Sequence, residues 1–346
     1  MNLRFLGGCR EVGKSAVQLT SKKTKIMMDY GINIEDEPPS YPNPAKNINA
    51  AIPTHAHLDH TGALPTLFKK SDTKLCVNDV TYELIKLLLE DSMKISKLEG
   101  YPKRYTKSDF RKMLKQTILT QYEKEYHIKN LNITQYDAGH IPGSSSILVK
   151  NGNKKLFYTG DINTADTELL KKCRLPGKVD TLVTESTYSY RDHPPKNKET
   201  DKLRKKVKSI VSTGGQVLIP AFAVGRSQEV LLMLEEFTDK MCLDGMSKKA
   251  SDIMLSHGKY IKNEKKLKKV LDKTTWIKDH GQRKKAVKNF PVIVSTAGML
   301  HGGPAIYYLK RMRDWNDLHV LFTGFLVEDS PGRLLLKTGR FEGEEE

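Results

Sequence analysis

The sequence predicts an α/β protein built from two domains. Its 346 residues are too many for one ordinary hydrophobic core and suit about two. In the first half, short apolar runs are broken by glycines or lysine pairs, which is typical of a β meander followed by mixed strands and helices. In the second half, strands alternate with helices, and this order predicts a parallel sheet. The composition changes across residues 192–199, so we place the boundary near residue 195 and predict domains at 1–195 and 196–346.

The first domain is predicted to begin with strands and to continue with helices. Apolar runs predict strands at 3–6, 16–20 and 25–29, and four prolines within 35–44 predict a loop. Apolar residues at helical spacing predict a helix over 79–90, capped by Asp79, and another over 108–115. Further strands are expected at 133–136, 146–149, 155–158 and 181–184.

The second domain shows the alternation that a parallel sheet requires. Helices are expected over 202–211, 227–238, 267–271 and 305–313. Strands are expected at 216–219, 292–295 and 319–322.

Composition excludes several classes of protein. The chain is 38% hydrophobic and 29% charged, which is typical of a soluble globular protein. No apolar run approaches the roughly 18–20 residues of a membrane span, so we expect no membrane partner. The first residues do not have the pattern of a secretory signal. The cysteines lie far apart and include no C-x-x-C pair, so they fit a reducing, cytoplasmic location better than a zinc ribbon: Cys9, Cys76, Cys173 and Cys242.

The net charge of +17 favours a polyanionic partner, with nucleic acid first. Three lysine- and arginine-rich stretches, 202–208, 262–269 and 283–285, all lie in the second half of the chain. A lysine-rich solubilising surface would also give a high net charge and remains the alternative. Because the basic residues are clustered, we favour a binding surface.

The most informative segment is His55-Ala-His57-Leu-Asp59-His60. It places three imidazoles and a carboxylate within six residues, and this combination of ligands suits zinc better than calcium or magnesium. His55 and His57 point the same way if their stretch is extended. A turn would then carry Asp59 and His60, with a helix starting near residues 61–62. One loop could therefore supply two adjacent ions, whereas the alternative is a histidine-rich surface loop.

Four further residues lie at strand ends or in the loops that follow strands. Asp29 ends a strand and could orient a ligand histidine by accepting its second N–H. His140 lies in a glycine-flanked loop, Asp161 follows a strand that exits through glycine, and Glu185 follows the strand at 181–184. Each residue alone could be an ordinary turn or surface residue. Their order along the chain, with Asp29 before the histidine-rich loop and the other three after it, is what makes them candidates for one site.

This pattern resembles the metallo-β-lactamase superfamily and, within it, the β-CASP nucleases. Asp29, the histidine-rich loop, His140 and Asp161 are similar to the first four superfamily motifs, in that order. Residues 184–188 and 191–194 resemble the acidic motif that opens the β-CASP insertion, and 219–229 resemble its signature strand and helix. The loops 295–304 and 323–333 resemble two later family loops. The resemblance covers nearly the whole chain and is strongest to the archaeal cleavage and polyadenylation factors, with ribonuclease J in the same group.

The resemblance implies both a fold and a metal site. The expected fold is a metallo-β-lactamase αββα sandwich with an inserted parallel α/β β-CASP domain. The expected cofactors are two Zn²⁺, with Mn²⁺ as the alternative. His55, His57 and His140 would hold one ion, Asp59 and His60 the second, and Asp161 would bridge both. Asp29 and Glu185 would orient these ligands.

The function that the resemblance implies is zinc-dependent hydrolysis of RNA phosphodiesters, in mRNA 3′-end processing or RNA decay. Endonuclease and 5′-to-3′ exonuclease action are both open. A non-catalytic RNA-binding scaffold subunit is the alternative, and a small-ester metallohydrolase is a third possibility. Homodimers are common in the family, so a homodimer is one expected assembly. The expected RNA-binding residues are Arg226, Ser295, Gly298, Gly324 and Arg333.

The sequence departs from the family pattern near its end. The family has a proton-donating histidine and a last ligand of the second zinc in a segment that would begin near 341–346. We therefore expect these two groups beyond residue 346, the chain being a fragment with an incomplete sandwich and little activity of its own. Neither role is transferred to the histidines of the second half: His257, His280, His301 and His319.

Overall fold

A computed structural model describes residues 1–341 and divides them into two compact units. Unit 1 comprises Met1–Asp166 and Lys171–Arg191, and unit 2 comprises Thr167–Leu170 and the residues from Asp192 onward. The domain boundary predicted near residue 195 lies within four residues of this division, and the exact boundary stays a prediction.

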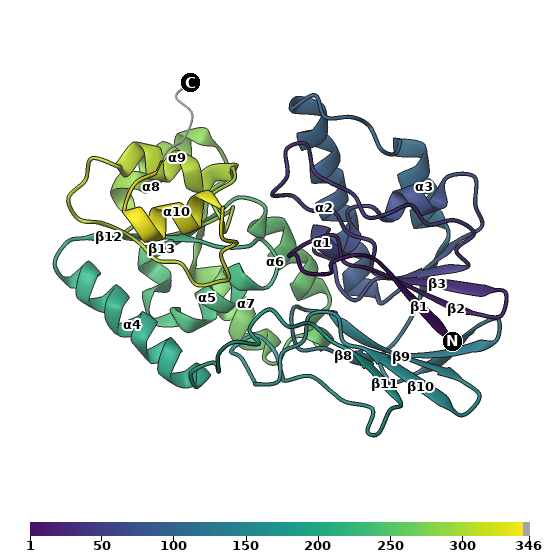
Figure 1. Ribbon diagram of the computed structural model, residues 1–346. Coiled ribbons are helices and arrows are strands. Elements are labelled where there is room, and N and C mark those ends of the chain that lie inside the picture. Colours follow the sequence, from purple (N-terminus) through teal and green to yellow (C-terminus); the bar gives the residue numbers. More distant parts are fainter. Residues whose placement is uncertain (342–346) are drawn as a thin grey trace. The chain divides into compact units, whose positions relative to one another are not determined.

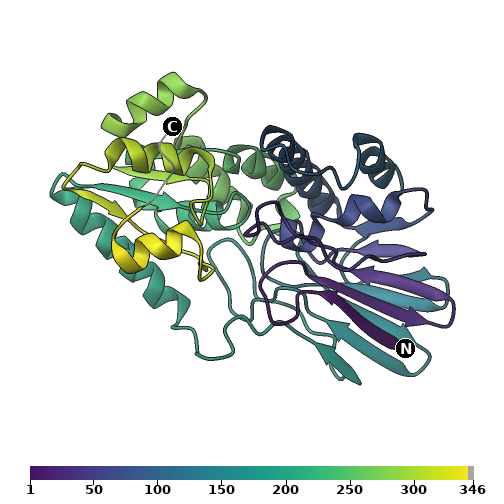
Figure 2. The same cartoon turned by 45° about the horizontal axis from the view of Figure 1, so that its top comes forward.

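Unit 1 contains two stacked sheets (Figures 1 and 2). The first has six strands in sequence order, antiparallel from β1 to β3 and parallel from β3 to β6. The second has five strands in the order β11-β10-β9-β8-β7, antiparallel except for the parallel pair β10–β11. The strands are β1 (Asn2–Gly7), β2 (Ala16–Ser21), β3 (Thr24–Met28), β4 (Ala50–Ile52), β5 (Lys74–Val77), β6 (Thr117–Leu119), β7 (Glu125–Ile128), β8 (Leu131–Asp137), β9 (Ser145–Asn151), β10 (Lys154–Tyr158) and β11 (Thr181–Val183).

The core of unit 1 lies between these two sheets. Buried aliphatic residues of the first sheet, such as Leu19 and Ile26, share one apolar cluster with Ile133 and Val149 of the second. Alternate residues of each strand point into this layer, as expected of sheets packed face to face. The arrangement holds the ends of β3, β4, β8 and β10 in one unit, and the candidate site residues follow these ends.

Helices cover the outer face of the first sheet (Figure 1). Asn78 caps α2 (Asp79–Leu98) by accepting from the Thr81 amide, so the cap is one residue earlier than predicted and the helix is longer. Helix α3 (Lys107–Lys115) begins with a capping box between Thr106 and Asp109. The short helix α1 (Leu58–Thr61) and a 3₁₀ helix (Leu64–Phe68) complete this layer.

Unit 2 is a parallel five-stranded sheet in the order β14-β13-β15-β12-β16. Helices lie on both of its faces, with α8 and α9 on one and α4 and α5 on the other (Figure 1). The strands are β12 (Gln216–Pro220), β13 (Met241–Asp244), β14 (Thr275–Trp276), β15 (Val292–Ser295) and β16 (Leu318–Val320). The helices are α4 (Lys196–Ser212), α5 (Arg226–Met233), α6 (Ser247–Ser256), α7 (Glu264–Lys273), α8 (His280–Asn289), α9 (Gly303–Met312) and α10 (Pro331–Thr338).

The short segment Thr167–Leu170 belongs to unit 2 although its neighbours in sequence belong to unit 1. The Glu229 carboxylate of α5 accepts the backbone amides of Glu168 at 2.9 Å and Leu169 at 2.7 Å. The Lys262 amide donates to the Leu169 carbonyl at 2.9 Å. Within unit 2, this segment is therefore anchored on α5 and on the chain that precedes α7.

The structure confirms the predicted fold class, a sandwich unit followed by a parallel α/β unit. Individual elements differ from the predictions. The helix expected over 227–238 ends at Met233 and continues as a 3₁₀ helix over Glu235–Lys240. Several short elements were not predicted, because runs of this length carry little periodicity: strands β4, β5, β6, β7, β13 and β14 and helices α6, α8 and α10. Among the described residues, no helix combines the length and apolarity needed to cross a membrane.

Candidate metal centre and nucleic-acid surface

The histidine-rich motif lies between β4 and α1 in unit 1. Residues 54–57 form bends after β4, and α1 begins at Leu58, earlier than the helix start predicted near residues 61–62. Asp59 and His60 therefore lie on the first turns of this helix, whereas His55 and His57 precede it. Gly31 lets the neighbouring loop approach closely, since a Cβ at this position would lie 1.7 Å from the Asp59 carbonyl oxygen.

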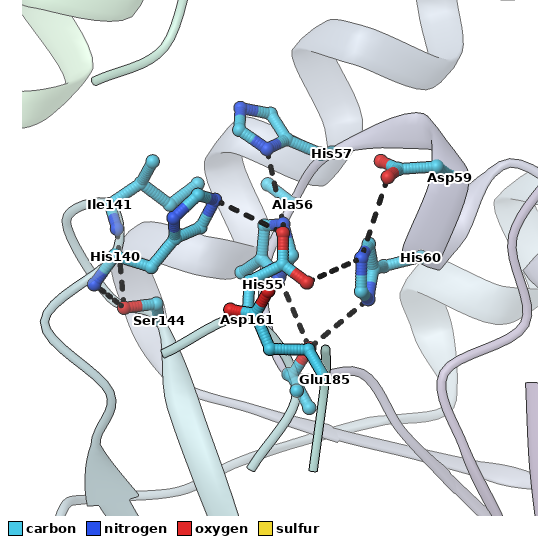
Figure 3. Close-up of polar contacts among 12 residues, drawn as sticks. His55, Ala56, His57, Asp59, His60, His140, Ile141, Ser144, Asp161 and Glu185 are labelled. Atoms are coloured by element: carbon cyan, nitrogen blue, oxygen red, sulfur yellow. Dashed lines mark hydrogen bonds and ion pairs between the residues drawn. The ribbon is translucent and has the colours of Figure 1, made fainter. Parts of the chain in front are cut away.

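The structure brings the predicted ligands together as two overlapping groups (Figure 3). One group is His55, His57 and His140, and the other is His55, Asp59 and His60. In each group the candidate ligand atoms all lie within 4.8 Å of one another. Within residues 1–341 these are the groups of three or more such residues, and no histidine of unit 2 belongs to either.

Asp161 lies between the two groups, as Figure 3 shows. Its Oδ2 is 3.5 Å from His140 Nε2 and 3.9 Å from His55 Nε2, and its Oδ1 is 3.3 Å from His60 Nε2. One carboxylate thus presents one oxygen to each group. Gly160, with φ +55°, makes this approach possible, because a Cβ there would lie 2.5 Å from the Thr54 side chain.

His140 is held by its own loop after β8. The backbone amides of His140 and Ile141 both donate to Ser144 Oγ, at 3.0 and 3.3 Å. The His140 Nε2 atom is buried and makes no hydrogen bond within the described structure. A buried nitrogen of this kind is suited to a metal ion, because an imidazole bound to a metal offers a lone pair instead of a proton.

Asp29 is fully buried at the end of β3 and holds His60 in place. It accepts from the Thr54 amide at 2.6 Å, the Thr54 hydroxyl at 3.0 Å and the Tyr158 hydroxyl at 2.7 Å. His60 Nδ1 lies 2.8 Å from Asp29 Oδ2, which leaves Nε2 directed toward Asp161 and Asp59. This is the arrangement by which a carboxylate orients a ligand histidine.

Glu185 holds the backbone next to Asp161. Its Oε1 accepts the backbone amide of Ile162 at 3.0 Å, so it fixes the turn that carries Asp161. Two residues of this site, Thr54 and Tyr158, were not predicted. Each is adjacent in sequence to a predicted motif, but neither residue type suggests a metal site by itself.

Burial and nearby charges lower the pKa of two histidines of the site and raise the pKa of a third. Burial, opposed in part by Asp161, lowers the pKa of His140 to about 4. Burial and the neighbouring His60 and His140 hold the pKa of His55 well below its usual range. Both rings are therefore neutral near pH 7, the protonation state that a metal ligand needs. Burial would also lower the pKa of His60, but Asp161, Asp59 and Asp29 outweigh it and raise this pKa well above the usual range.

This raised pKa predicts how the metal-free protein responds to pH. A group whose pKa is higher in the folded than in the unfolded protein stabilises the fold fully below the unfolded pKa of about 6.5. That contribution is lost as the pH rises through the folded pKa. In urea unfolding with a chelator present, we expect the stability advantage of the native protein over His60→Gln to shrink from pH 6 toward alkaline pH. An advantage that stays constant would contradict this assignment, and the exposed His127→Ala should behave like the native protein.

Three of the predicted RNA-binding residues converge in unit 2 on the ring of Phe222. A Cβ on Gly298 would lie 3.0 Å from the Phe222 amide nitrogen. A Cβ on Gly324 would lie 3.5 Å from the Phe222 ring and 3.9 Å from Arg226 Nε. These glycines therefore leave room beside a guanidinium at the start of α5.

The other two predicted RNA-binding residues lie elsewhere in unit 2. Ser295 is fully buried at the end of β15, where its carbonyl accepts the Ala221 amide at 2.9 Å, so it is not available at a surface. Arg333 lies on α10, with its Nε 3.7 Å from Glu328 Oε2. The exposed lysines of the predicted basic stretches lie on α4, α7 and α8.

Comparison with known protein families identifies both halves of the chain. Residues 227–335 match the family model described as "Beta-Casp domain". Residues 1–195 match the model described as "Anti-Pycsar protein Apyc1".

Curated relatives are similar over nearly the whole chain. "Probable RNase MJ4" of Methanocaldococcus jannaschii is 37% identical, and the match covers 100% of this chain and 84% of that protein. "RNase aCSPSF2" of Saccharolobus solfataricus is 37% identical over 98% of this chain and 70% of its own length. "Transcription termination factor FttA" of M. jannaschii is 33% identical over 96% of this chain and 57% of its own length.

These matches agree with the motifs and with the two-unit fold. Relatives named as ribonucleases share more than a third of their aligned residues with this chain across both units. The family is metal-dependent, and the two overlapping groups of histidine and aspartate in unit 1 are a candidate metal site. The resemblance expected from the sequence is therefore confirmed, and the chain belongs to the metallo-β-lactamase β-CASP ribonuclease family.

Proposed function

We propose that this chain is a zinc-dependent ribonuclease that hydrolyses RNA phosphodiesters. The observation that carries the proposal is the position of Asp161, whose two carboxylate oxygens face His55 and His140 on one side and His60 on the other. Imidazole nitrogens combined with carboxylates favour zinc, with manganese as the alternative ion. The names of the relatives support RNA as the substrate.

In this proposal each ligand has a defined place. His55, His57 and His140 would hold one ion, Asp59 and His60 would hold the second, and Asp161 would serve both. A pair of bound ions supplies an activated water and stabilises the phosphoryl oxygens of an in-line displacement. The protein's own contribution is to keep the ligands oriented. Asp29 holds the His60 ring through Nδ1, while Glu185 holds the turn that carries Asp161.

RNA would be bound by the basic residues of unit 2. We assign phosphate binding to Arg226 beside Phe222 and to the exposed lysines of α4, α7 and α8. Binding of this kind depends on salt, because bound lysines release counterions from the phosphates. Neutralising three phosphates of a single strand predicts an affinity loss of about 20-fold between 50 and 200 mM salt.

The contribution of helix α7 to the salt dependence of RNA binding can be tested separately. The triple variant Lys265→Gln, Lys268→Gln and Lys269→Gln on α7 should bind RNA more weakly and with a smaller salt slope. The matched control carries three exposed lysines of unit 1, Lys22→Gln, Lys23→Gln and Lys154→Gln, and should keep the native slope. Equal slopes in both triple variants would remove α7 from the RNA-binding surface.

The proposed function is tested by the metal content of the chain together with cleavage of a labelled single-stranded RNA. Two zinc ions per chain and cleavage that stops on chelation would support the ribonuclease. Tight RNA binding with neither metal nor cleavage would favour the scaffold alternative. Hydrolysis of a thioester without hydrolysis of RNA would favour a small-ester hydrolase.

A further inference from the structure

Unit 1 has a surface cavity that the proposed metal site does not use. Its volume is about 290 Å³, and its walls come from the end of β1, the turn 7–14 and the loop 41–43. We name it the Tyr41 pocket after its aromatic wall residue. A nucleobase with its sugar fits a cavity of this size, which is at the lower end of the range for ligand sites.

The walls combine aromatic and apolar groups with a few polar ones. Phe5, 48% exposed, and Tyr41 contribute rings, and Pro42 contributes a flat apolar surface. The Arg104 guanidinium lies 5.5 Å from the centre of the Tyr41 ring, which adds a cation beside the pocket. Aromatic rings at a surface are the groups on which proteins stack the bases of single-stranded RNA.

The polar groups of the pocket suit the edge of a base better than a phosphate. Lys14 Nζ lies 2.9 Å from Glu11 Oε2, so the only ammonium in the wall is already paired with a carboxylate. This pair offers both donors and acceptors, and the Asn43 side chain offers both as well. The ammonium of the wall is therefore engaged by a carboxylate and less available to a phosphate, whereas a base presents donors and acceptors that this pair and Asn43 can match.

The pocket walls are held by hydrogen bonds to neighbouring backbone. The Asn43 amide donates to the Leu6 carbonyl at 2.9 Å. The Tyr30 hydroxyl donates to the Asn43 carbonyl at 3.1 Å and accepts from the Ala45 amide at 3.3 Å. The loop 41–45 is therefore fixed to β1 and to Tyr30, which is the kind of prior order that lowers the cost of binding.

Backbone hydrogen bonds connect the walls of the pocket with the loop that carries two of the candidate metal ligands. The Tyr30 amide donates to the His60 carbonyl at 2.8 Å, so one tyrosine connects the pocket wall with a predicted ligand. On the other wall, Ser15 follows Lys14 and donates its amide to the Asp59 carbonyl at 2.9 Å. Lys14 of the pocket wall is thus one residue along the chain from Ser15, which is hydrogen-bonded to the loop that carries Asp59 and His60.

We propose that the Tyr41 pocket binds one base of the RNA that is cleaved at the metal centre. This inference rests on the proposed function and deepens it by adding a base-binding position in unit 1. The ring of Phe5 stacks on the base, and the Lys14–Glu11 pair and Asn43 bind its polar edge. The substrate class is therefore single-stranded RNA with an unpaired base at this position.

The first experiment measures RNA affinity and zinc content of Phe5→Ala. Loss of one stacked base weakens binding by about 1–3 kcal/mol, which corresponds to about five- to 150-fold. We expect that loss for a labelled single-stranded RNA, with unchanged zinc content and with affinity restored in Phe5→Tyr. Leu98→Ala, which removes an apolar side chain that is 84% exposed at the end of α2, is the matched control and should bind normally. Native affinity in Phe5→Ala would overturn the proposal.

The second experiment requires neither cleavage nor zinc. It also uses no substitution in β1, which could prevent folding. Cys9 lines the pocket and is exposed, whereas Cys76 and Cys242 are buried. Burial raises the pKa of Cys76 to about 12, so its thiol stays protonated at pH 8. With Cys173→Ser as background, iodoacetamide therefore reports on Cys9.

We expect millimolar adenosine monophosphate to slow alkylation of Cys9 several-fold, and ribose 5-phosphate to have no effect. Equal rates with and without the nucleotide would overturn the pocket, and so would equal protection by ribose 5-phosphate. The two proposals fail separately. A chain that lacks zinc and cleavage but shows protection by the nucleotide would refute the ribonuclease and support the pocket.

Discussion

Replacing Asp161 by asparagine is expected to abolish RNA cleavage while RNA binding stays within about twofold of native. The amide keeps the size of the carboxylate but carries no charge, so it cannot serve two groups of ligands as Asp161 Oδ1 and Oδ2 do. Loss of a residue that only supports a metal ligand costs about 10–100-fold. Loss of a shared ligand should therefore cost more than 100-fold in kcat/KM, and zinc content should fall.

The control for this experiment is a histidine that lies outside the candidate metal centre. His127→Ala removes an exposed histidine of β7 whose ring contacts Asn132, and it should leave zinc content and cleavage unchanged. His57→Ala should behave like Asp161→Asn. Native activity in Asp161→Asn would refute the metal assignment, whereas lost RNA binding in that variant would indicate unfolding or a role in binding.

The second large effect is expected at Asp29, and it concerns stability. Asp29 is fully buried and accepts four hydrogen bonds from Thr54, His60 and Tyr158. In Asp29→Asn, the charged His60 loses a buried partner, and removing one partner of a buried ion pair costs about 3–5 kcal/mol. Asparagine tolerates the positive φ of 59° at this position, so the backbone is not the cause of the loss.

This prediction is tested by unfolding the metal-free protein in urea and monitoring the transition by circular dichroism and by tryptophan fluorescence. Both tryptophans, Trp276 and Trp315, lie in unit 2, so their fluorescence reports on that unit. We expect the transition of unit 1 to shift to lower urea in Asp29→Asn, with little change in the fluorescence transition. Asp72→Asn, at an exposed position, should change stability by less than about 0.5 kcal/mol. Equal stability of both variants would contradict the buried network.

Much of the site could be predicted because its ligands are short-range features of the sequence. His55, His57, Asp59 and His60 lie within six residues, and metal-binding chemistry restricts which residue types can fill such a motif. Asp29, His140 and Asp161 each follow a strand. In the structure β3 is parallel to β4, and β8 and β10 are both antiparallel to β9, so each of these pairs of strands ends at one edge of its sheet.

The supporting residues could not be predicted in the same way. Tyr158 bonds to Asp29 across 129 residues of sequence, and tyrosine at the end of a strand is ordinary in any sheet. Ser295 was expected at an RNA-binding surface from its loop, yet it is buried, because β15 lies inside the sheet between β12 and β13. The cap of α2 and the end of α5 moved by one to a few residues, as local hydrogen bonds decide helix ends.

The family, the two-unit α/β architecture and the set of candidate metal ligands follow from the order of the amino acids alone, since these depend on residue types at fixed spacing. The tertiary structure decided how Asp161 is shared, which histidines are neutral, and that Tyr30 and Ser15 connect the Tyr41 pocket to the metal loop. Those features arise from distances, burial and charge among residues far apart in the chain. They exist only once the two sheets of unit 1 have packed.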